Sequence, residues 1–147
     1  MNVDLQAKAI FAQHYNCSQS VLSVFAEQYG LDLSTALKLA TPFGGGMGHT
    51  GQVCGAVSGA LMVIGLAAGI SEIDRGQKYR CYDLASEFHM RFRALHGDVT
   101  CPGLLGMDIR NPHELARVRE LKLFDTLCCH FVADAARLVE ELLAERV

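Results

Sequence analysis

The sequence predicts an all-α fold: one domain built as a bundle of about five to six helices around a central apolar helix rich in small residues. Helix-favouring residues dominate, and only three prolines interrupt the chain, Pro42, Pro102 and Pro112. No run of residues alternates between apolar and polar as a half-buried strand would. With 147 residues the chain has the usual length of a single domain, so we expect residues 1–147 to share one core.

Residues 43–69 form the stretch around which the other elements are expected to pack. The stretch opens with a glycine-rich loop and continues into a segment, 54–68, that carries no charged side chain. That segment predicts a buried helix with Cys54 in or near its first turn. It is apolar for about fifteen residues, short of the roughly 20 that a membrane span needs, so we expect no membrane insertion. Its Gly55 and Gly59 predict close packing against another helix.

The segments before the glycine-rich loop read as three helices. Apolar spacing predicts a helix over residues 4–15 and a second over 18–30, which stops at Gly30. Asn16 and Ser18 break the first helix and can cap the second. A short third helix is expected over 31–40, ended by Thr41 and Pro42.

The segments after the central helix read as two long helices joined by a loop. Residues 73–95 predict an amphipathic helix that ends at Gly97, with a buried side made by Tyr79, Tyr82, Leu84, Ala85, Phe88, Phe92 and Leu95. Residues 98–112 are expected to be a loop that carries Cys101. The last helix is expected to start at Pro112 or His113 and to run to about 146. Cys128 falls on its apolar stripe, whereas Cys129 projects about 100° further round.

Composition excludes several classes of function. The net charge is −3, no basic stripe is present, Trp is absent and aromatic residues make up 7%, so a nucleic-acid-binding surface is not expected. The first fifteen or so residues are amphipathic and lack the apolar core of a signal peptide. The sequence therefore predicts a cytoplasmic protein.

The six cysteines are the strongest indication of function in the sequence. In a reducing cytosol they are expected to bind metal, to be redox-active or to fill the core rather than to form structural disulfides. No C-x-x-C motif is present. Cys17, Cys54 and Cys101 fall at predicted loop–helix junctions, where backbone N–H groups favour a thiolate, and Cys128 or Cys129 is a fourth candidate. Cys81, in the middle of a helix, is expected to be structural.

The glycine-rich loop matches G-x-G-x-x-G between Gly46 and Gly51, but no strand precedes it, so a dinucleotide site is not expected. We expect the glycines to let the backbone approach a cofactor such as a cluster, or a partner thiol, closely. The candidates for this role are Gly44, Gly45, Gly46, Gly48, Gly51 and Gly55. Four histidines also lie near cysteines or loops, but their spacing does not define a mixed Cys/His metal site: His14, His49, His96 and His130.

The order of these motifs resembles a known family over essentially the whole chain. The motifs are Cys17 before a helix, then FGGGMG at 43–48, CGAVSGAL at 54–61, CPGLLG at 101–106 and a cysteine in the last helix. This order resembles the C_GCAxxG_C_C family of redox-active proteins. The resemblance implies a small all-helical protein with characteristic cysteines at Cys17, Cys54, Cys101 and either Cys128 or Cys129. It also implies genes that often lie near transporter genes.

Two classes of function remain open from the sequence. In the first, the cysteines form one redox site, either as ligands of an iron–sulfur cluster or as a thiol–disulfide pair. In the thiol–disulfide form, Cys54 attacks and a neighbour such as Cys101 resolves the disulfide. The metal ligands would be Cys17, Cys54, Cys101 and Cys128. In the second class, the chain is a non-catalytic module that binds metal or sulfur species for a membrane transporter. The redox partner is unidentified, and a homodimer is the candidate assembly.

Overall fold

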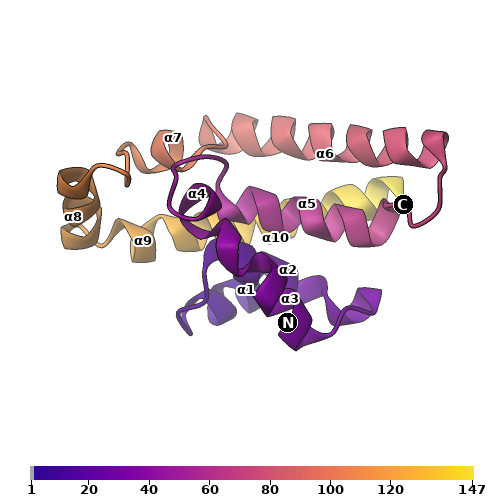
Figure 1. Ribbon diagram of the computed structural model, residues 1–147, viewed down its shortest axis with the longest axis horizontal. Coiled ribbons are helices and arrows are strands. Elements are labelled where there is room, and N and C mark those ends of the chain that lie inside the picture. Colours follow the sequence, from indigo (N-terminus) through magenta and orange to yellow (C-terminus); the bar gives the residue numbers. More distant parts are fainter. Residues whose placement is uncertain (1) are drawn as a thin grey trace.

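The computed structural model describes residues 2–147 and confirms the all-α fold (Figure 1). Its helices, in chain order, are α1 (Val3–Phe11), α2 (Cys17–Phe25), η1 (Glu27–Tyr29), α3 (Leu33–Ala40), η2 (Thr41–Phe43), α4 (Gly44–Met47), α5 (Gly55–Ala68), α6 (Arg75–His96), α7 (Cys101–Leu105), α8 (Pro112–Glu120), α9 (Leu123–Thr126) and α10 (Cys128–Arg146). Within residues 2–147 there is no β-strand, and Val53 and Thr100 form an isolated antiparallel bridge. None of the helices in this range is long and apolar enough to cross a bilayer.

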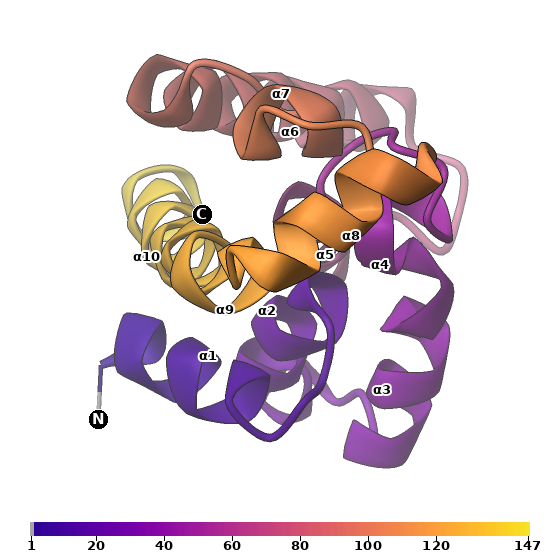
Figure 2. The same cartoon turned by 90° about the vertical axis from the view of Figure 1, so that its left-hand side faces the viewer.

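Three long helices, α5, α6 and α10, lie side by side and pack against one another (Figure 1). Helices α1 and α2 pack on α10 and on each other, and α2 also packs on α5. The short helices α4, α7, α8 and α9 gather at the end of the bundle where α5 and α10 begin and α6 ends. Figure 2 looks at this end directly. The candidate site lies here.

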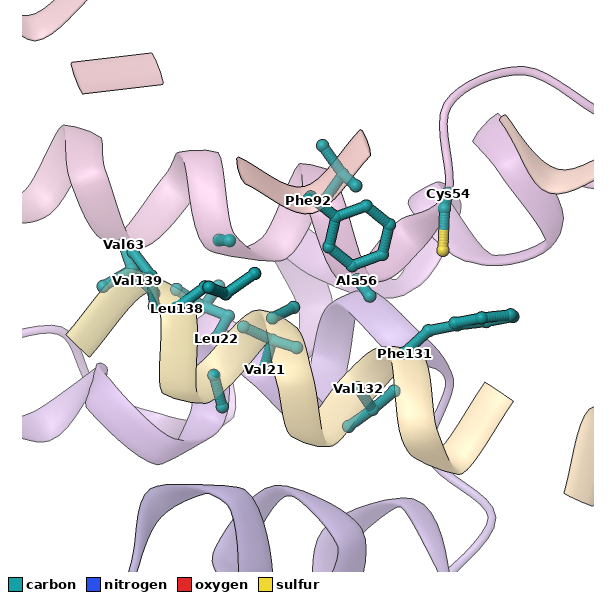
Figure 3. Close-up of a cluster of buried hydrophobic side chains, with 14 of the residues drawn as sticks. Val21, Leu22, Cys54, Ala56, Val63, Phe92, Phe131, Val132, Leu138 and Val139 are labelled. Carbon is teal, nitrogen blue, oxygen red and sulfur yellow. The ribbon is translucent and has the colours of Figure 1, made fainter. Parts of the chain in front are cut away.

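Helix α5 is the central element, as the sequence predicts. Almost every residue of its first turns is buried, and its Ala56 and Val63 are part of the core shown in Figure 3. Small residues let α2 approach the backbone of α5 directly. A Cβ atom built on Gly59 would lie 2.8 Å from the carbonyl oxygen of Ser18, which is closer than real Cβ contacts allow. The G-x-x-x-G pattern of α5 therefore serves helix–helix packing inside the core.

The glycines of α5 give a matched pair of stability predictions. We expect Gly59→Ala to destabilise the fold by about 1–3 kcal/mol, because the new methyl group meets the backbone of α2. We expect Gly65→Ala to stabilise it by up to about 1 kcal/mol, because a Cβ there meets nothing within 4 Å and alanine favours the helix. Urea unfolding of both variants tests this. Equal effects would show that the small-residue face is not a packing constraint.

Helices α3, α5 and α6 have nearly the predicted bounds, whereas α2 ends at Phe25 and a separate 3-10 turn, η1, precedes Gly30. Asn16 caps α2 through a reciprocal pair of bonds with Gln19, each of 2.9 Å. Asp32 caps α3, and Gly97 ends α6. Helix α1 is shorter than predicted: it ends at Phe11, and a turn with positive φ at His14 follows.

The predicted buried side of α6 is only partly right. Leu84, Phe88 and Phe92 are buried, but Tyr79 and Tyr82 are 50% and 56% exposed, and Leu95 is exposed as well. The reason is geometric: α5 and α10 both pack on one side of α6, so the apolar residues outside that narrow stripe face water.

The prediction of one long C-terminal helix is wrong. The segment is divided into α8, α9 and α10. Lys122 has a left-handed backbone (φ 56°) that separates α8 from α9, and Leu127 separates α9 from α10. The predicted loop at 98–112 also contains a helix, α7, which is capped by the hydroxyl of Thr100. Both differences place a cysteine at the first residue of a helix, Cys101 in α7 and Cys128 in α10.

Candidate functional site

Four cysteines stand at the N-terminal ends of four helices that meet at one end of the bundle. Cys17 begins α2, Cys54 is the N-cap of α5, Cys101 begins α7 and Cys128 begins α10. All four line one cavity of about 190 Å³. The full lining is Phe11, Asn16, Cys17, Gly45, Gly46, His49, Cys54, Gly55, Cys101, Leu104, Leu105, Phe124, Cys128 and Phe131. Figure 3 shows Cys54 at the edge of the core, with its sulfur directed to the side on which Phe131 lies.

The glycine-rich segment is a left-handed helical turn rather than an irregular loop. Every residue from Gly45 to His49 has a φ between 62° and 70°. The turn is closed by the N–H of Gly48, which donates to the carbonyl of Gly44 at 2.9 Å. Left-handed backbone costs about 1–2 kcal/mol for each L-residue with a side chain, which explains why glycine occupies most of these positions. At Gly46 a Cβ would lie 3.0 Å from the Cβ of Cys101, so the turn packs directly on that cysteine.

A short backbone pairing holds Cys54 beside Cys101. The N–H of Cys54 donates to the carbonyl of Val99 at 2.8 Å, and the N–H of Cys101 donates to the carbonyl of Gln52 at 2.9 Å. These bonds flank the antiparallel bridge between Val53 and Thr100. The pairing spans too few residues to produce an alternating pattern, so the sequence does not reveal it.

Cys17 reaches the same place because Gly55 has no side chain. A Cβ built on Gly55 would lie 3.2 Å from the Cβ of Cys17 and 3.0 Å from the N of Ser18. The start of α2 is fixed by the Asn16 capping box and by the buried Ser18 hydroxyl, which donates to the carbonyl of Ala40 at 2.6 Å. Cys17 is therefore held in contact with the N-terminus of α5.

The four thiols do not have equal acidity. The pKa of Cys54 is lowered, first by a hydrogen bond from Cys17 and then by the N–H groups of Ala56 and Val57, against the opposing effect of burial. The pKa of Cys17 is raised well above its usual value by its interactions with Cys128 and Cys54 and by burial. Burial, with smaller effects of Cys54 and Cys128, raises the pKa of Cys101 to about 12. Cys54 is therefore the most acidic of these three thiols, and Cys17 is the largest cause of its lowered pKa.

Alkali is expected to destabilise the fold through these buried thiols. An unfolded thiol loses its proton near pH 8.5 or so, whereas folded Cys101 keeps its proton up to a pKa of about 12. The stability that Cys101 contributes is complete below about pH 8.5 and is lost as the pH rises towards 12, by up to about 1.4 kcal/mol per pH unit. Urea unfolding at about pH 7.5 and about pH 10 measures the loss. Cys101→Val should lose less stability over this range, and equal losses would contradict the assignment.

The rest of the cavity wall is mostly apolar: it carries Asn16 and His49 but no Asp, Glu, Lys or Arg. Cys54, Gly55, Cys101 and Cys128 are buried, whereas His49 is exposed, so the cavity reaches the surface at His49. His96 packs against Phe131, with their ring centroids 5.0 Å apart. Burial lowers the pKa of His96, and Asp134, at 3.0 Å, partly offsets this. The sequence identifies none of the apolar lining residues, because they come from helices that it does not show to be neighbours.

The remaining candidate residues lie at or beyond the edge of the cavity. Cys129 is outside the lining: its thiol faces the carbonyl of Thr126 at 3.6 Å and a separate hollow that also contains His14. Cys81 lies in α6 and is also outside the lining. Of the six candidate glycines, Gly45, Gly46 and Gly55 line the cavity; Gly44, Gly48 and Gly51 do not. His49 is in the lining, whereas His14, His96 and His130 are not.

The cysteines are close together, but they are not arranged around a single ion. Among residues 2–147, no three Cys, His, Asp or Glu side chains have the spacing to hold one metal ion.

Comparison with protein families agrees with the cysteine pattern. Residues 15–142 match a family model described as "Putative redox-active protein (C_GCAxxG_C_C)". Comparisons with curated proteins and with solved structures find no significant match. The matched region contains all four cysteines that line the cavity. The chain therefore belongs to the C_GCAxxG_C_C family.

Proposed function

We propose that the protein is a thiol–disulfide redox protein in which Cys54 is the attacking thiolate and Cys17 resolves the disulfide. The observation that carries this proposal is that Cys17 and Cys54 line one cavity at the N-terminus of α5, where Cys17 packs on Gly55, the residue after Cys54. A helix N-terminus and a neighbouring donor are the usual means of producing a reactive cysteine. Cys17 is favoured over Cys101 as the resolving thiol because Cys17 is the largest cause of the lowered pKa of Cys54. Cys128, which also interacts with Cys17, is favoured over Cys129 as the fourth member of the site.

The reaction is a two-electron transfer from the protein thiols to a substrate disulfide. The Cys54 thiolate attacks one sulfur of the substrate, a mixed disulfide forms, and the first substrate thiolate leaves with the proton of Cys17. The Cys17 thiolate then attacks the sulfur of Cys54. This forms the Cys17–Cys54 disulfide and releases the second substrate thiolate, which takes a proton from solvent. A dithiol reductant reverses the change and completes the cycle.

Mass spectrometry of the protein treated with a small disulfide tests the proposal. We expect a loss of two hydrogen atoms, a disulfide peptide that links Cys17 to Cys54, and full recovery with dithiothreitol. Cys17→Ser should stop at the mixed disulfide on Cys54, while Cys81→Ser should close normally. A mixed disulfide that resolves equally well in Cys17→Ser would overturn the role given to Cys17.

An iron–sulfur cluster is the second candidate, because four cysteines surround one uncharged cavity. The donor set suits such a cluster, which would be held by Cys17, Cys54, Cys101 and Cys128 and would supply one-electron transfer. Anaerobic purification with assays of visible absorption, iron and acid-labile sulfide separates the two candidates. Coloured protein with matching iron and sulfide would favour the cluster. Stoichiometric binding of metal or sulfur species without redox turnover would instead favour a binding module for a transporter.

A further inference from the structure

We propose that the cavity beside Cys54 is a substrate pocket for small, uncharged disulfides and that it excludes charged ones. This inference rests on the proposed thiol–disulfide function and names its substrate class. It is carried by the size of the cavity, by the chemistry of its wall and by the position of the reactive sulfur on its floor.

The size of the cavity sets an upper limit on the substrate. Its volume is about 190 Å³, many times the roughly 10–15 Å³ that one water molecule requires. One half of a short dialkyl disulfide can enter this space beside Cys54, while the other half remains at the mouth. The pocket is therefore matched to a small molecule.

The wall offers little compensation to a charged group. It contains no Asp, Glu, Lys or Arg, and its histidine, His49, is exposed. The amide of Asn16 is already engaged, because it accepts from the N–H of Gln19 and donates to the carbonyl of Thr41, each at 2.9 Å. The N–H groups of Ala56 and Val57 already interact with Cys54, so a charged substrate would lose its hydration with little compensation. An anion would also be repelled by a thiolate at Cys54.

The wall does offer good contacts for short alkyl groups and for sulfur. The rings of Phe11, Phe124 and Phe131 and the side chains of Leu104 and Leu105 surround the space. Apolar contact favours the carbon atoms of the substrate, and a divalent sulfur atom packs favourably against aromatic rings. The substrate class that uses all of these contacts is an uncharged organic disulfide.

The experiment compares neutral and charged reagents of the same shape at Cys54. Iodoacetamide is compared with iodoacetate, and bis(2-hydroxyethyl) disulfide with cystamine and with dithiodiacetate. Each rate at Cys54 is divided by the rate for the urea-unfolded chain, which removes the intrinsic reactivity of the reagent. We expect the normalised rates of the neutral reagents to exceed those of the anionic reagents by roughly 30-fold or more, and cystamine also to fall below the neutral disulfide. Normalised rates within about threefold of one another would overturn the inference.

A charge placed at the mouth provides a second test. Leu104 is partly buried in α7, and the long stem of a lysine can follow the same wall while its ammonium reaches water. We expect Leu104→Lys to raise the rate with iodoacetate relative to iodoacetamide by about tenfold. Leu66→Lys, an exposed change in α5 outside the lining, should leave this ratio unchanged. An unchanged ratio in both variants would contradict the position of the pocket.

The two proposals can fail separately. If no disulfide oxidises Cys17 and Cys54, the proposed function fails, while the ratio for the alkylating reagents still measures the preference for uncharged ligands. If the pair closes equally well with all three disulfides, the function stands and the substrate class is wrong.

Discussion

Cys54→Ser is expected to abolish disulfide formation by small disulfides, slowing closure at the site by at least about 100-fold. A serine hydroxyl in this place is not ionised at neutral pH, so no nucleophile remains at the N-terminus of α5. The measurement is the rate of the two-hydrogen mass loss after addition of bis(2-hydroxyethyl) disulfide. Cys17 and Cys101 are not expected to replace Cys54: interactions with Cys128 and Cys54, together with burial, raise the pKa of Cys17, and burial raises the pKa of Cys101 to about 12.

Cys81→Ser is the matched control for this prediction. Cys81 is a partly buried cysteine in α6 outside the cavity lining, so its removal should leave the rate of closure within about twofold of the native rate. Equal losses of activity in the two variants would remove the special role of Cys54. A fall confined to Cys81→Ser would place the chemistry on α6.

Cys17→Val is expected to move the alkylation of Cys54 to higher pH. Cys17 is the largest cause of the lowered pKa of Cys54, because its thiol donates a hydrogen bond to the thiolate. A hydrogen bond to an ionised group contributes about 1.5–3 kcal/mol, so the rate with iodoacetamide at neutral pH should fall roughly tenfold. The pH profile of alkylation at Cys54, followed by peptide mass spectrometry, gives the measurement.

Cys17→Ser separates hydrogen bonding from packing. A serine hydroxyl can still donate to the thiolate, so this variant should keep a pH profile close to that of the native protein, whereas valine removes the donor. Identical profiles for valine and serine would show that the N–H groups of Ala56 and Val57 stabilise the thiolate without help from Cys17.

The sequence predicts the fold class and the central helix because both depend on local patterns. The small residues of α5 and the cap at Asn16 are visible in the order of the residues alone. The division of the C-terminal segment is not, because Lys122, where the backbone is left-handed, is an ordinary helix former. For the same reason the exposed tyrosines of α6 are predicted as buried: periodicity shows an apolar face but not how much of it is covered.

The sequence predicts the cysteines of the candidate site but not the residues that form the wall of its cavity. Cys17 and Cys54 can be placed near helix starts because loops end just before them, whereas the short helix α7 that begins at Cys101 is predicted as loop. The contact of Cys17 with Cys54 depends on two helices meeting at Gly55, and the pairing of Cys54 with Cys101 depends on a two-residue bridge. The phenylalanines of the cavity come from α1, α9 and α10, which are distant in the chain. Such long-range contacts leave no periodic signal.

The thiols of the site come from helices that are far apart in sequence, so a disulfide between two of them would cross-link distant parts of the chain. A bond between Cys17 and Cys54 would close a loop that includes α2, α3 and the left-handed turn. In the chain-entropy model, closing a loop of this length lowers the conformational entropy of the unfolded state, which raises its free energy by about 4 kcal/mol. The oxidised protein would then unfold less readily than the reduced one. By the same thermodynamic cycle, the native fold would make the disulfide harder to reduce than the same pair in a flexible chain.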